Sequence, residues 1–132
     1  MEKTIHFPEG IPGFEHLKNY ILLEEEESIF CQLQSIEDKA IAFIIVNPYT
    51  LDPHYAPTIQ EQYFEGLGGG STEDFMLYTI VTLGQDMASS TVNLRAPLLI
   101  NVEKRMGVQV FVEDKQYKMR HSMTSFLLEG RA

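Results

Sequence analysis

The sequence predicts a mostly β protein: a single-domain, barrel-like sandwich of short antiparallel strands with one short helix. Three observations predict this class. The 132 residues correspond to about one domain, short apolar or alternating runs recur along the chain, and Gly, Pro or charged residues separate these runs. Many short strands at this spacing favour antiparallel pairing over alternating strand–helix units. We therefore expect one domain over residues 1–132, with residues 122–132 as a partly helical or mobile tail.

The expected strands follow from apolar alternation and from the turn residues that end each run. In the first, Ile5 and Phe7 share one face, and Pro8 ends the strand because proline lacks a backbone donor. Residues 40–46 are apolar on both faces, which predicts a central strand that is covered on both sides. The expected strands are residues 4–7, 20–23, 29–34, 40–46, 75–83, 91–94, 98–102, 108–112 and 117–121.

One helix is expected, over residues 59–67. The segment from Thr58 to Glu61 fits a capping box, in which the Thr58 side chain caps the helix and Glu61 reaches back. Apolar residues then recur four positions apart, as they do on one side of a helix. The preceding residues 49–57 contain two prolines, and we expect an irregular loop there.

The charge is acidic and unevenly distributed. The chain carries 10 Lys and Arg against 19 Asp and Glu, a formal net charge of −9. Residues 40–94 contain no Lys or Arg at all, whereas residues 95–132 are mildly basic. Such a balance argues against direct nucleic-acid binding, which needs cations that displace counterions from phosphate. An acidic surface attracts a basic partner, although solubility alone is the simpler explanation of acidity.

The cysteine count and the length of the apolar runs indicate where in the cell the protein is expected. The single cysteine, Cys31, cannot form an internal disulfide, which fits a reducing cytoplasm. The apolar run over residues 40–46 is too short to cross a bilayer, and the N-terminal residues lack the apolar core of a signal peptide. We therefore expect a cytoplasmic protein with no membrane partner.

No enzymatic or metal-binding motif stands out. The four histidines and Cys31 lack the spacing of a zinc site, and no nucleophile motif is present. Cys31 lies on the apolar side of its expected strand, as a small buried hydrophobic residue would. We expect no catalytic residue, metal or cofactor. The alternative is a small-ligand-binding or hydrolytic β-barrel protein with Arg105, Arg120 and His121 around a polar mouth.

Several segments together resemble the FliW family of flagellar assembly factors, over about residues 5–121. They include the loop from Phe7 to Glu15, the run from Ala42 to Pro48, and the segment from Thr91 to Pro97. Gly68 to Ser71 departs from the family, in which this connection is usually charged. The family-signature positions are Pro12, Gly13, Asn47, Pro48, Asn93, Pro97, Asn101, Arg105 and Gly107.

The resemblance implies a barrel-like antiparallel sandwich and a role in binding rather than catalysis. FliW proteins bind the translational repressor CsrA and prevent it from silencing flagellin messenger RNA. They also bind flagellin, so that synthesis of flagellin follows its secretion. Direct masking of the RNA site and coupling from another surface both remain open, as does a flagellin chaperone without a regulatory role.

Charge and exposure suggest where these partners dock. CsrA-type repressors are basic, so we expect their site in the part of the chain without cations. Flagellin's terminal segments are amphipathic helices and need an apolar groove. For Phe14, packing under the preceding loop is the favoured alternative. The candidates are Glu61, Glu65, Glu73, Asp74 and Asp86 for CsrA, and Ile11, Phe14, Tyr49 and Tyr55 for flagellin.

Overall fold

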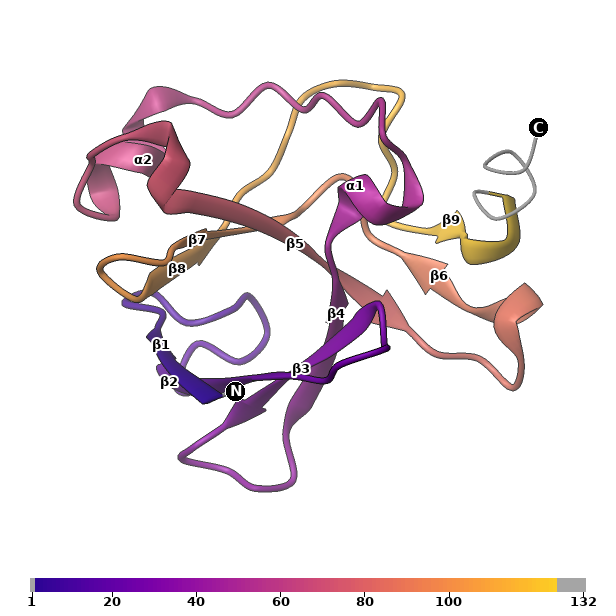
Figure 1. Ribbon diagram of the computed structural model, residues 1–132, viewed down its shortest axis with the longest axis horizontal. Coiled ribbons are helices and arrows are strands. Elements are labelled where there is room, and N and C mark those ends of the chain that lie inside the picture. The colour runs from indigo at the N-terminus through magenta and orange to yellow at the C-terminus, as the bar shows by residue number, and fades with distance from the viewer. Residues whose placement is uncertain (1, 126–132) are drawn as a thin grey trace.

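The computed structural model describes residues 2–125, which form nine strands and a few short helices (Figure 1). Most strands lie close to the expected segments. The strands are β1 (Glu2–His6), β2 (Asn19–Glu24), β3 (Phe30–Ser35), β4 (Ala42–Val46), β5 (Phe75–Thr82), β6 (Thr91–Val92), β7 (Leu98–Asn101), β8 (Met106–Gln109) and β9 (His121–Ser122). The helices are α1 (Pro48–Leu51), α2 (Glu61–Gly66) and the 3₁₀ turns η1 (Thr72–Asp74) and η2 (Met87–Ser89).

Seven strands close a barrel in the order β4-β3-β2-β1-β8-β7-β5, and β5 pairs with β4 to complete it. Strand β6 pairs with the end of β5, and β9 pairs with β6 beside the barrel. The predicted barrel-like class is confirmed. One pairing corrects the antiparallel expectation: β1 and β8 run parallel through His6 and Met106. These two strands are far apart in sequence, so no hairpin turn forces them to be antiparallel.

Alternate residues of the strands enter two apolar cores. The inner core fills the barrel and includes Phe7, Tyr20 and Ile45. The outer core lies on the outer face of β4, β5 and β7, where later segments of the chain cover it. Ile45 is buried in the inner core and its neighbour Val46 in the outer core. Cover on both faces is therefore confirmed only at the end of the expected strand, because Phe43 and Ile44 are partly buried and Ala42 is exposed.

The helices differ from expectation in two ways. The expected loop after residue 48 begins with α1, which Asn47 caps by accepting a hydrogen bond from the Tyr49 N–H. Helix α2 begins at Glu61 rather than at residue 59, and the capping box does not form. Instead, the Thr58 N–H and hydroxyl donate to the Asp114 carboxylate, at 3.0 and 3.3 Å. A partner 56 residues away in sequence thus takes the place of the local cap.

The last strands are shorter than predicted. Strand β8 starts at Met106, and beyond it Val110 and Val112 donate backbone hydrogen bonds to the 95–97 segment. Of the expected final strand only His121 pairs, together with Ser122 of the expected tail, and Met123 of that tail is fully buried. Residues 126–132 of that tail lie outside the described residues. Among residues 2–125, no helix is long and apolar enough to cross a membrane.

Candidate functional site

A groove of about 470 Å³ lies over the outer face of β5, between α1 and α2. Its lining is mostly aromatic and aliphatic, which is the surface that a docked amphipathic segment needs. A hollow of about 270 Å³ adjoins it on the α2 side and shares four of its residues. The groove, here called the α1–α2 groove, is lined by Asn47, Tyr49, Pro57, Ile59, Phe64, Thr72, Phe75, Met76, Leu77 and Leu99.

The α1 wall is built by a local capping signal. Asn47 occupies the N-cap position and Pro48 the first helical turn, where proline costs no hydrogen bond. This turn presents Tyr49, which is 44% exposed and lines the groove. The Tyr49 ring also contacts the Tyr55 ring, with 5.8 Å between centroids. The exposed tyrosine is therefore held by a defined helix and by a buried ring.

The residues beneath this wall form a hydrogen-bonded tyrosine pair. The Tyr55 and Tyr117 rings meet edge-on at 4.7 Å. The Tyr55 hydroxyl donates to the Leu94 carbonyl at 2.7 Å, and the Tyr117 hydroxyl accepts from the Ala56 N–H at 2.8 Å. Burial raises the pKa of the Tyr55 hydroxyl, so it stays a neutral donor. These bonds fix the segment that connects α1 to α2.

The α2 wall is held by ring packing and by one buried amide. Phe64 of α2 meets Phe75 of β5 edge-on at 4.9 Å. The Asn101 amide donates to the Leu67 carbonyl at 2.9 Å, just beyond the helix. Met76, between these walls, is 37% exposed. The groove thus combines a rigid frame with two exposed large hydrophobic side chains, Tyr49 and Met76.

Acidic residues surround the α2 end of the groove. Glu61 and Glu65 project from α2 and are exposed, and Glu61 lines the adjoining hollow. Glu73 and Asp74 lie in η1, where the Asp74 carboxylate accepts from the Ser71 N–H. We call Glu61, Glu65, Glu73 and Asp74 the α2 acids.

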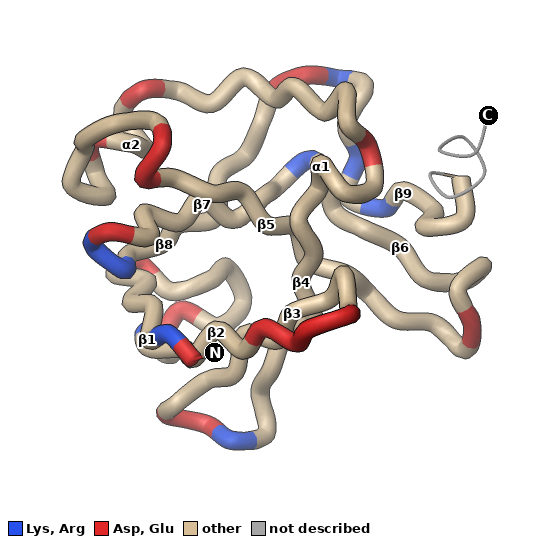
Figure 2. Tube along the Cα trace, in the orientation of Figure 1, with Lys and Arg blue, Asp and Glu red and all other residues tan. Residues whose placement is uncertain are grey.

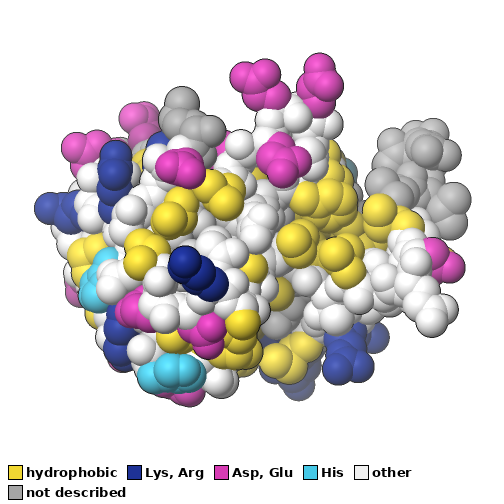
Figure 3. All heavy atoms as spheres, turned by 90° about the horizontal axis from the view of Figure 1, so that it is seen from below, with side chains coloured by type: hydrophobic (Ala, Val, Ile, Leu, Met, Phe, Trp, Pro, Cys, Tyr) yellow, Lys and Arg dark blue, Asp and Glu magenta, His cyan; other side chains and the backbone are white. Residues whose placement is uncertain are grey.

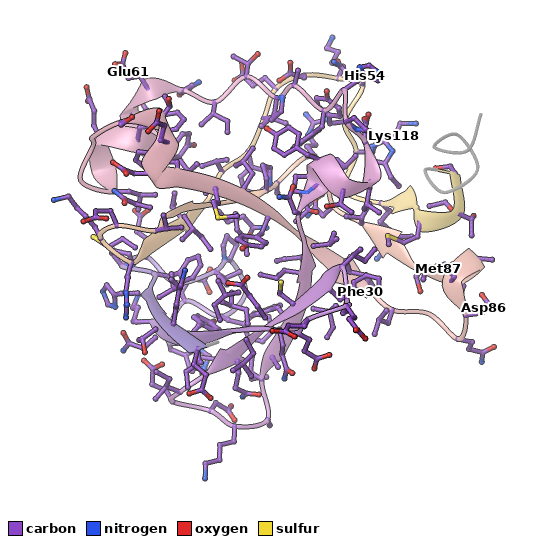
Figure 4. All side chains as sticks on the ribbon, in the orientation of Figure 1. Phe30, His54, Glu61, Asp86, Met87 and Lys118 are labelled. Carbon is purple, nitrogen blue, oxygen red and sulfur yellow. The ribbon has the colours of Figure 1, made fainter. Side chains whose placement is uncertain are left out.

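Asp86 does not belong with the α2 acids. It lies in the loop between β5 and β6, at the other end of the molecule from Glu61 of α2, as Figure 4 shows. There its carboxylate accepts a hydrogen bond from the Ser89 N–H and caps η2. The expectation that all five acids share one surface is therefore wrong, because a cation-free stretch of sequence spans both ends of the barrel.

Two of the four apolar candidates are not exposed. Ile11 and Tyr55 are both buried, Ile11 in the inner core and Tyr55 in the outer core. Phe14 is half-buried and packs edge-on against Phe43 at 5.2 Å, in line with the favoured alternative. Only Tyr49 lines the groove. Loop position alone did not reveal these contacts, which are made with distant strands.

Three groove residues, Phe64, Phe75 and Met76, are not among the residues predicted from the sequence. Strand alternation gives no signal for Met76 as a groove residue, because it places Met76 on the opposite face from Leu77, which also lines the groove. No local signal places Phe75 against Phe64, since that contact depends on how the 67–74 segment folds back.

Most signature positions shape the backbone rather than the groove. Pro12 and Gly13 form the turn that joins Ile11 to Phe14, with Gly13 at a φ of +94°. Asn93 accepts from the N–H groups of residues 95 and 96 and so shapes the bend that leads through Pro97 into β7. A side chain at Gly107 would collide with the Phe7 ring. Asn47 is the signature residue that also lines the groove.

The alternative polar mouth is not formed. Arg105 lies in the turn before β8, whereas Arg120 directly precedes β9 and His121 begins it. Strands β8 and β9 lie on opposite sides of the molecule (Figure 1 and Figure 2). His121 accepts from the Lys118 N–H at 2.8 Å, and burial lowers its pKa. Within the part of the chain that the structure describes, no group of His, Cys, Asp and Glu could hold a metal ion. Cys31 is half-buried, and burial raises its thiol pKa.

Comparison with known proteins gives concordant matches. The family model described as FliW protein matches residues 1–123. The flagellar assembly factor FliW of Caldicellulosiruptor saccharolyticus is 42% identical over 120 residues, which cover 91% of this chain and 79% of the relative. That of Clostridioides difficile is 38% identical over 120 residues, covering 90% and 92%. A crystal structure of the flagellar assembly factor FliW superposes with a TM-score of 0.83 at 36% identity, covering 91% of this chain and 84% of the other.

Proposed function

This chain belongs to the FliW family of flagellar assembly factors, and we propose that it binds two partners through the α1–α2 groove and the α2 acids. Flagellin occupies the groove with an amphipathic terminal segment. A CsrA-type translational repressor docks on the α2 acids and is then prevented from silencing flagellin messenger RNA. Flagellin that accumulates in the cytoplasm displaces the repressor, which couples synthesis of flagellin to its secretion.

The observation that carries this proposal is the contact between the two sites. The hollow that Glu61 lines shares Ile59, Phe64 and Phe75 with the groove. A protein seated on the acids therefore lies beside any segment in the groove, and the two partners compete for space. Two neighbouring sites, one apolar and one acidic, thus allow one partner to displace the other without a conformational change in this protein.

Flagellin binding is tested at the two exposed groove residues. The double variant Tyr49→Ala with Met76→Ser removes two apolar contacts at the rim. We expect it to weaken flagellin binding by about tenfold or more, since buried anchors dominate such interfaces. Both side chains are substantially exposed, so the thermal midpoint should change little. Unchanged flagellin affinity, measured by calorimetry, would place the flagellin site elsewhere.

Repressor binding is tested by two matched charge reversals. Glu61→Lys, Glu65→Lys and Glu73→Lys reverse three exposed α2 acids and leave Asp74 in its cap. Glu25→Lys, Glu26→Lys and Glu27→Lys make the same change of charge in the β2–β3 hairpin. We expect the first triple variant to slow repressor association by about tenfold at low salt, and the second to change it little.

The outcomes separate the candidate functions. Equal losses in both triple variants would mean that only net charge matters and would contradict the proposed site. Binding of flagellin without any binding of the repressor would identify a flagellin chaperone with no regulatory role.

A further inference from the structure

One end of the outer sheet face has no cover from the described chain. Elsewhere on this face, α1, α2 and the 110–123 segment cover the outer core. Beyond that cover, Phe30 of β3 and Ile44 of β4 are only partly buried. Leu83, directly after β5, is 59% exposed, and Met87 of η2 is 39% exposed. We call these four residues the hairpin face, because they lie between the β2–β3 hairpin and the 83–90 loop.

The strand register places these side chains on the same side of the sheet. Ile44 lies opposite Val81, and Leu83 follows Val81 by two residues, so its side chain leaves the same face. Phe30 and Met87 lie on either side of the end of β5 (Figure 4). A hollow of about 130 Å³ is lined in part by Phe30, Ile44 and Glu25. The hairpin face therefore combines apolar side chains with a shallow hollow in the surface.

Acidic residues border this face. Glu25, Glu26 and Glu27 are exposed in the hairpin, and Asp86 precedes Met87 in the loop. Figure 3 shows hydrophobic side chains gathered on this side of the molecule with acidic side chains next to them. Neither β4, β5 nor the 83–90 loop contains Lys or Arg. The border thus favours a cationic occupant.

Backbone pairing and charge together limit which kind of partner could bind to the hairpin face. At Val81, β5 is paired with β4 on one edge and with β6 on the other, so neither edge is free there for an added strand. An exposed sheet face is instead covered by a helix, as α1 and α2 do elsewhere in this fold. A second copy of the chain would bring its own acidic hairpin to the same place, and the like charges would repel.

We propose that the hairpin face docks an amphipathic helix with a basic polar side, supplied by a partner protein. Apolar residues of the helix contact Phe30, Ile44, Leu83 and Met87, while its Lys and Arg residues face Glu25, Glu26, Glu27 and Asp86. This surface lies at the opposite end of the barrel from α2, so the proposal does not depend on the proposed function of the groove.

The test uses a designed helical peptide of about 18 residues, with leucine on one side and lysine on the other. Isotope-labelled protein is titrated with it, and amide shifts are mapped by NMR. We expect shifts in β3, β4 and residues 83–87. A peptide of the same composition in scrambled order, and one with glutamate in place of lysine, should bind at least about tenfold more weakly.

Variants of the protein complete the test. The double variant Leu83→Ser with Met87→Ser should weaken binding of the peptide by about tenfold. The hairpin triple variant, Glu25→Lys, Glu26→Lys and Glu27→Lys, should weaken it by a similar factor. The α2 triple variant should bind the peptide normally. Shifts confined to the α1–α2 groove, or equal affinity for the scrambled peptide, would overturn the proposal. So would a concentration-dependent dimer in sedimentation that Leu83→Ser with Met87→Ser abolishes, since the face would then bind a second copy.

Discussion

Two buried tyrosines differ in how their hydroxyls are satisfied. Tyr20 is fully buried in the inner core, packed edge-on against Phe7, and its hydroxyl has no hydrogen-bond partner among the described residues. Tyr55 donates to the Leu94 carbonyl. A buried polar group without a partner destabilises the folded state, whereas a made bond contributes about 1 kcal/mol.

Phenylalanine substitutions should therefore act in opposite directions at these two positions. Tyr20→Phe should leave the free energy of unfolding unchanged or raise it by about 1 kcal/mol, and Tyr55→Phe should lower it by about 1 kcal/mol. Urea unfolding of both variants measures the difference. A clear loss of stability in Tyr20→Phe would mean that its hydroxyl makes a favourable bond in solution.

The burial of the Tyr78 hydroxyl predicts how the stability of the fold changes at alkaline pH. Burial raises the pKa of its hydroxyl from the ordinary value of 10.0 to about 12. In the unfolded chain the hydroxyl releases its proton first, so the unfolded state binds fewer protons between these values. Stability should be intact below pH 10.0 and fall as the pH rises toward 12. Unfolding followed by tyrosine absorbance checks this, and Tyr78→Phe should reduce the fall. An equal fall in that variant would assign the effect to other groups.

At the scale of elements, the cap of α1 connects stability to the groove. Asn47→Ala removes the acceptor of the Tyr49 N–H, which should cost about 1 kcal/mol and loosen the wall that carries Tyr49. We expect weaker flagellin binding in this variant and recovery in Asn47→Asp, which keeps the acceptor. Asp38→Ala, which removes the acceptor of the Ala40 N–H in the β3–β4 hairpin, should also destabilise the protein but leave flagellin affinity unchanged. Equal binding losses in both would show that the cap has no specific role.

The elements show which features the sequence predicts and which it does not. Apolar alternation located most strands, because burial of one or both faces leaves a direct pattern in the residues. The cap at Thr58 failed because Asp114 competes for the same N–H, and no local pattern contains that contact. Helix α1 was missed although Asn47 and Pro48 are a normal start signal, since the prolines that follow indicated a loop.

At the scale of the whole molecule, the closed barrel determines where on the surface the charged residues of each chain segment lie. The region without cations contributes α2 at one end and the 83–90 loop at the other. The distribution of charge along the sequence therefore does not show that Asp86 lies apart from the α2 acids. The resulting molecule has two acidic surfaces, each beside an apolar one: the α1–α2 groove and the hairpin face.

Competition between flagellin and the repressor tests the central claim most directly. Fluorescently labelled CsrA-type repressor is bound to the protein, and purified flagellin is titrated while anisotropy is followed. We predict full displacement from the wild-type protein. The Tyr49→Ala, Met76→Ser variant should keep its repressor and require about tenfold more flagellin for displacement. A stable complex of all three proteins, or displacement that is unchanged in the groove variant, would contradict adjacent competing sites.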